Sequence, residues 1–121
     1  AAQVRELERR FRELLDTLQP EVAGLEKLFF SKNQKTALRV AEARGLLHGL
    51  LLARGVPVYE CGPAEVKIAV TNYGRADKEA VRTMVCRMLG SERFTGHDDA
   101  SDALAIAIAT LNSARIDRIN R

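Results

Sequence analysis

Two short apolar segments separated by a long helical pattern constrain this fold more than any other feature. Val22–Leu28 and Val56–Cys61 each have the length and composition of a buried strand. Between them, residues 36–53 repeat apolar side chains at helical spacing, and Gly55 follows where the helix should end. A strand, a long helix and a second strand predict a parallel pair joined by a right-handed crossover.

The rest of the chain is dominated by helical patterns. We expect an amphipathic helix over residues 4–18 that Pro20 terminates, and a short helix over residues 63–70. A further helix should open near Asp77, and a last one near Asp99. Parallel strands are normally buried inside larger sheets, and two strands are too few for this much helix. We therefore expect an α/β fold whose sheet is incomplete, with its other strands placed before the first residue.

Composition limits the class of protein without fixing it. The chain has 121 residues, a length typical of one domain, so we expect a single domain over 1–121. The net charge of +3 permits a nucleic-acid partner but does not require one. No apolar run approaches the ~20 residues of a membrane span, and no signal-peptide pattern opens the chain. Cys61 and Cys86 have no metal-binding spacing and are typical of buried thiols, which favours a cytoplasmic protein.

Three acidic residues stand in unusual places. Asp99 and Asp102 are three positions apart at the start of the last helix, so their carboxylates should share one face. They are equally suited to favouring the helix start electrostatically, although Asp98 or Ser101 could cap the helix instead. Glu26 lies inside an apolar strand, which indicates either a solvent-facing edge position or a metal ligand at a strand end. Hard oxygen ligands of this kind suit Mg²⁺ or Mn²⁺, and two such ions can promote phosphodiester cleavage.

An aromatic pair follows Glu26 in the segment FFSKN. Phe29 and Phe30 are either core residues at the end of a strand or exposed rings that stack on nucleic-acid bases. In the second case the neighbouring polar and basic side chains could hold phosphates. Those side chains are Lys32, Asn33, Lys35 and Arg39.

A second basic segment, VKIAVTNYGRADKEAV, contains Lys67, Arg75 and Lys78 around a turn. We expect Gly74 to supply the backbone freedom that this turn needs. The charges fit a solvated basic face, and they also fit a phosphate-binding surface beside the carboxylates. His97 has no partner at metal-ligand spacing and is more typical of a surface loop.

Several of these blocks together resemble one family. The segments LEKLFFSKN, ALRVAEARG, VPVYECGPAEVKIAVTNYGRADKEAV and DASDALAIAIA occur in the order and spacing of the RuvC family of crossover-junction endodeoxyribonucleases. The resemblance covers essentially all of residues 15–112. It implies a ribonuclease H-like fold, a homodimer, and magnesium-dependent symmetric nicking of Holliday junctions in DNA recombination and repair. It also implies two metal ions per site, with Mn²⁺ as a substitute, and RuvA and RuvB as partners in branch migration.

The resemblance also assigns roles to residues. Glu26, Asp99 and Asp102 would be the metal-binding catalytic carboxylates. Phe29 would contact bases at the junction, and Lys67 and Lys78 would lie near the cleaved phosphate. Lys32 and Asn33 would also contact DNA, and Arg75 would be a weaker addition.

Two features depart from the family pattern. Asn72 stands where the family usually has a glycine, so the local backbone should differ slightly. The family's first strand carries Gly-x-Asp-Pro-Gly, whose aspartate completes the metal site, and no such motif occurs in this sequence. We therefore expect this chain alone to be inactive. The competing hypotheses are a non-catalytic nucleic-acid-binding or assembly module derived from the same fold, and a relative that acts on RNA.

Overall fold

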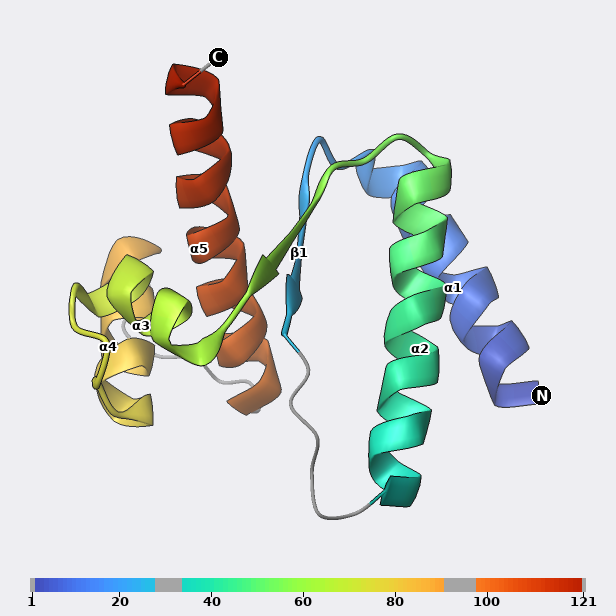
Figure 1. The fold of residues 1–121 in the computed structure, drawn as a ribbon, viewed down its shortest axis with the longest axis horizontal. Coiled ribbons are helices and arrows are strands. Elements are labelled where there is room, and N and C mark those ends of the chain that lie inside the picture. The colour runs from blue at the N-terminus through green and yellow to red at the C-terminus, as the bar shows by residue number, and fades with distance from the viewer. Residues whose placement is uncertain (1, 28–33, 91–97, 121) are drawn as a thin grey trace.

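The chain places helices on both sides of a small parallel sheet (Figure 1). The computed structural model describes residues 2–27, 34–90 and 98–120. In these ranges no helix combines the length and the apolar character needed to cross a membrane. The elements are α1 (Ala2–Leu18), β1 (Ala23–Glu26), α2 (Gln34–Ala53), β2 (Val58–Cys61), α3 (Pro63–Thr71), α4 (Lys78–Met88) and α5 (Asp98–Ile119).

Strands β1 and β2 pair in parallel, as the strand–helix–strand order predicts. The register aligns Ala23 with Val58 and Glu26 with Cys61. Beyond the last pair, the Lys27 N–H donates to the Cys61 carbonyl at 2.9 Å. Both strands are shorter than the sequence suggests. Their carboxyl ends lie at the same edge of the sheet, which is where functional side chains of α/β proteins gather.

Two separate apolar clusters hold the layers together. On one side, α2 lies against the strands with α1 behind it, and Leu15, Leu51 and Val56 form the buried cluster. On the other side, α5 crosses the sheet and packs against α3 and α4 (Figure 1). There the buried cluster is Val70, Val85 and Ala105, and Val85 is completely inaccessible to solvent. The sheet is thus the middle layer of three.

Gly24 explains how closely α5 approaches β1. A Cβ atom built on Gly24 would overlap the Thr110 hydroxyl oxygen and approach Ile106 Cγ2 to 3.2 Å. A glycine inside a strand commonly marks such a close backbone approach. Thr110 is itself fixed, because its hydroxyl donates to the Ile106 carbonyl at 2.7 Å and lies 3.7 Å from Cys61 Sγ. This contact sets the spacing between the strand that carries Glu26 and the helix that carries Asp102.

The turn between α3 and α4 differs from the sequence expectation. Asn72, with φ 65° and ψ 17°, adopts the left-handed conformation that ends α3, and its N–H donates to the Ile68 carbonyl. Gly74 has no positive φ, so the expected role of Gly74 as the flexible residue was wrong. Asparagine tolerates the left-handed region better than most side chains. That tolerance explains how Asn72 can end α3 in this conformation.

The start of α5 bears on one expectation. The description of α5 begins at Asp98, directly after the residues that are not described, so capping by Asp98 stays a prediction. Ser101 lies inside the first turn of the helix and is buried, with 5% of its surface exposed. Ser101 is therefore not the capping residue.

Candidate functional site

A pocket of about 420 Å³ lies at the carboxyl ends of the two strands. It is formed by the end of the sheet together with the amino-terminal halves of α3, α4 and α5. Its lining combines apolar side chains with charged side chains of both signs. The lining residues are Glu26, Cys61, Pro63, Val66, Lys67, Lys78, Val81, Asp102, Ala105 and Ile106.

Two of the three predicted carboxylates line this pocket. Glu26 is the last residue of β1 and is exposed, so the cost of burying a charge does not arise for it. Asp102 faces the pocket from α5, and its side chain is 48% exposed. Asp99 is exposed one turn earlier in α5 and is not a lining residue. Across residues 2–27, 34–90 and 98–120, no three His, Cys, Asp or Glu side chains come together as a metal site.

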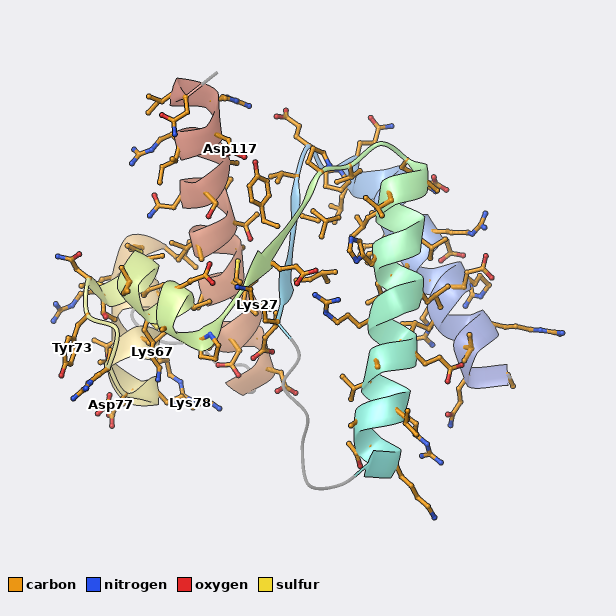
Figure 2. All side chains as sticks on the ribbon, in the orientation of Figure 1. Lys27, Lys67, Tyr73, Asp77, Lys78 and Asp117 are labelled. Atoms are coloured by element: carbon orange, nitrogen blue, oxygen red, sulfur yellow. The ribbon has the colours of Figure 1, made fainter. Side chains whose placement is uncertain are left out.

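Two predicted lysines reach the same pocket from different helices. Lys67 lies in the middle of α3, and Lys78 is the first residue of α4 (Figure 2). Lys78 Nζ lies 3.6 Å from Asp102 Oδ2, and both side chains are about half exposed or more, so the ion pair contributes little to stability. Asp77 fixes the start of α4, because its Oδ1 accepts the Ala80 N–H at 2.8 Å. The pocket therefore combines two acidic and two basic side chains supplied by four elements.

An ion pair that the sequence did not suggest joins two of the elements that line this pocket. Lys27 Nζ donates to Glu65 Oε1 at 3.0 Å, and the Gly62 N–H lies 3.4 Å from the same oxygen. The bond from Lys27, and after it the bond from Gly62, lowers the pKa of Glu65 below 4.5. The hydrogen bond to Glu65 raises the pKa of Lys27 in turn. The pair joins the end of β1 to the first turn of α3, and Glu65 three residues after Gly62 is the only sequence signal for it.

Arg44 supports the strand end from the opposite layer. It lies in α2 with 18% of its side chain exposed, and its Nε donates to the Glu26 carbonyl oxygen at 3.1 Å. Its terminal nitrogen lies 3.4 Å from Glu60 Oε1 on β2. Arg44 thereby links α2 to both strands beside the Glu26 backbone. Nothing in the sequence distinguishes Arg44 from Arg39, the other arginine of α2.

The remaining predicted residues lie away from the pocket or cannot be placed. Arg75 is exposed on the turn between α3 and α4, and it forms no ion pair within the described part of the chain. Phe29, Lys32, Asn33 and His97 lie outside the described residues.

Comparison with solved structures defines the class of this protein. The chain superposes on Thermus thermophilus RuvC with a TM-score of 0.86, at 34% identity, covering 96% of this chain and 70% of that one. A second structure, T. thermophilus RuvC in complex with Holliday junction substrate, gives a TM-score of 0.88 at the same identity and coverage. The fold is therefore ribonuclease H-like, with acidic and basic side chains gathered at the ends of its strands. The profile of the family described as crossover junction endodeoxyribonuclease RuvC matches residues 1–110, and this chain belongs to that family.

Curated relatives agree with this assignment. The crossover junction endodeoxyribonuclease RuvC of Moorella thermoacetica is 50% identical over 97 residues, which are 80% of this chain and 58% of the relative. The protein of the same name from Thermotoga maritima is 41% identical over 109 residues, 90% of this chain and 65% of the relative. The chain thus spans about three fifths of the length of such relatives.

Proposed function

We propose that this chain forms most of the catalytic domain of an endonuclease that resolves Holliday junctions by metal-dependent, symmetric nicking of phosphodiester bonds. The observation that carries the proposal is the pocket that brings Glu26, Asp102, Lys67 and Lys78 together from four elements. Membership of the RuvC family supports it, as does the junction complex of the Thermus relative. In this proposal the carboxylates bind metal ions and the lysines bind the phosphodiester.

The carboxylates fit a magnesium site that needs further ligands. Glu26 and Asp102 offer hard oxygen donors from two elements, and Asp99 stands one turn away on α5. Magnesium, or manganese in its place, would activate water and neutralise the leaving oxygen when two ions are bound. Two lining carboxylates are a sparse set for two ions. We therefore propose that the family's first-strand aspartate completes the site, and that this chain alone does not cleave DNA.

The lysines act on the substrate's charge. Lys67 has no ion pair among the described residues, so its ammonium group is available to a phosphate oxygen in the pocket. Lys78 is kept near Asp102 at 3.6 Å, which holds its ammonium group at the rim and limits repulsion between the carboxylate and the DNA. The two lysines thus hold an anionic backbone beside an acidic cluster that would otherwise repel it.

The wider assembly follows from the same proposal. Symmetric nicking of paired strands needs two sites, and we propose that a homodimer supplies them. Phe29, Lys32 and Asn33 would contact the junction next to Glu26, and RuvA and RuvB would be the partners in branch migration. The protein would act in the cytoplasm.

Glu26→Gln tests the proposal, in a chain extended by the amino-terminal segment of the Moorella relative. We expect nicking of a four-way junction in Mg²⁺ to fall at least about 100-fold, because a metal-held transition state is worth several kcal/mol. Junction affinity should change by less than about twofold, since the amide keeps the size of the side chain. Glu42→Gln, on the exposed surface of α2, is the matched control and should leave nicking unchanged. Equal nicking by the two variants would refute the role of Glu26, and no nicking by any form would favour the non-catalytic module.

A further inference from the structure

The turn that joins α3 to α4, two helices that line the pocket, presents an exposed aromatic side chain. This turn, residues 72–77, connects the helix that carries Lys67 to the helix that carries Lys78. Tyr73 lies on it with 59% of its surface exposed. Figure 2 shows Tyr73 on the same side of the molecule as the two lysines. The other tyrosine, Tyr59, differs because its hydroxyl donates to Asp117 Oδ2 at 2.6 Å.

The backbone of Tyr73 is held in place although its ring is exposed. The Thr71 hydroxyl accepts the Tyr73 N–H at 3.2 Å and donates to the Lys67 carbonyl at 2.8 Å, with the Tyr73 carbonyl as a second acceptor at 3.1 Å. The Ala76 N–H also donates to the Tyr73 carbonyl, at 3.2 Å. One hydroxyl therefore connects the helical turn of Lys67 to the residue that bears the ring. A ring on a fixed backbone loses little entropy when a ligand covers it.

The charges around the ring favour an anionic partner. Arg75 lies two residues after Tyr73, is exposed, and has no ion pair within the described ranges. The nearest carboxylate in sequence, Asp77, is engaged by the Ala80 N–H at 2.8 Å. Ile68, which is 53% exposed, adds apolar surface beside the turn, since it lies 3.5 Å from where a Gly74 Cβ would be. An exposed ring, an apolar neighbour and a free guanidinium suit a nucleotide, whose base or sugar is apolar and whose phosphate is anionic.

We propose that Tyr73 packs on a nucleotide of the DNA strand that enters the pocket, with Arg75 on an adjacent phosphate. This inference rests on the proposed function, because it takes the pocket as the DNA phosphate site. Four helical residues and two extended ones separate Tyr73 from Lys67, so their Cα atoms lie within about 13 Å of each other. One strand of duplex DNA rises about 3.4 Å per nucleotide. Both side chains extend outward from these positions, so the two contacts fall within a few nucleotides of each other on one strand.

Fluorine NMR tests the contact directly, because the chain contains only two tyrosines. In protein labelled with 3-fluorotyrosine, Tyr59→Phe identifies the resonance of Tyr73. Addition of a four-way DNA junction should shift or broaden the Tyr73 resonance and leave that of Tyr59 in place. An unmoved Tyr73 resonance at saturating junction would overturn the inference.

Affinity supplies the second measurement. Tyr73→Ala should weaken junction binding, followed by fluorescence anisotropy, about 5- to 100-fold, and Tyr73→Phe should stay within about twofold of the parent. Equal affinities for the alanine and phenylalanine variants would overturn the inference. Lys67→Ala separates this failure from failure of the proposed function. Binding that depends on Lys67 but not on Tyr73 refutes only the stacking role, whereas absence of binding to the junction refutes both.

Discussion

The contact between Gly24 and Thr110 makes a sharp prediction about stability. Gly24→Ala inserts a methyl group where the Thr110 hydroxyl oxygen and Ile106 Cγ2 already lie. Neither neighbour can move freely, because the Thr110 hydroxyl is bonded to the Ile106 carbonyl and Ile106 belongs to α5. Forcing a methyl group into such a site typically costs about 1–3 kcal/mol. The loss should appear as a urea midpoint about 0.5–2 M lower, with an unchanged slope of the free energy of unfolding against urea concentration.

Gly49→Ala is the matched control for this substitution. Gly49 lies in α2, and nothing would stand within 4 Å of its new Cβ. Alanine is favoured over glycine inside a helix, so this variant should be about 0.5–1 kcal/mol more stable than the parent. Circular dichroism at increasing urea concentration measures both variants under the same conditions.

A double-mutant cycle assigns the cost to the predicted neighbour. Thr110→Ala removes the hydroxyl that the new methyl group would overlap, so the penalty of Gly24→Ala should fall by at least about 1 kcal/mol in that background. A penalty of the same size in both backgrounds would refute the packing argument. A Gly24→Ala variant that is as stable as the Gly49→Ala variant would also refute the packing argument.

Three further variants test other contacts. Lys27 and the Gly62 N–H lower the pKa of Glu65, so the stabilisation that they give the parent is present above pH 4.5 and is lost as the pH falls through the lowered pKa. Glu65→Gln should remove this pH dependence, which unfolding measured at decreasing pH would show. Asn72→Ala should cost about 1 kcal/mol in thermal unfolding because of the left-handed backbone, whereas Asn72→Gly should cost nothing, and equal effects would contradict the assigned conformation. Leu51→Ala should cost about 2–5 kcal/mol in urea unfolding, because Leu51 is 3% exposed in the cluster between α1 and α2, and a loss below 1 kcal/mol would contradict that packing.

The sequence was most informative where a pattern repeats along the chain. Helical spacing and short apolar runs predicted the parallel pair, because periodicity reports directly which face of an element is buried. Glu26 and Asp102 were anomalies against those patterns, and the structure brings both to one pocket. Their use in catalysis remains a prediction.

Contacts between distant segments were not predictable in the same way. Lys27 and Glu65 are 38 positions apart, and each alone is an ordinary surface charge. Arg44 contacts the Glu26 carbonyl only because α2 crosses the sheet at that point. Such pairs depend on the angle and offset of packed elements, which periodicity does not specify. Gly24 did carry a signal, since a glycine in a strand often marks a close backbone approach.

Adding an amino-terminal segment from a relative tests the proposed function most directly. The measurement compares this chain alone with the chain extended by the Moorella amino-terminal segment, using a four-way junction with labelled strands in Mg²⁺. The extended chain should nick two opposing strands at symmetric positions, and the chain alone should nick none. Symmetric nicking by the chain alone would contradict the account of the incomplete carboxylate set. An extended chain that binds the junction without nicking it would contradict the assignment of the pocket to catalysis.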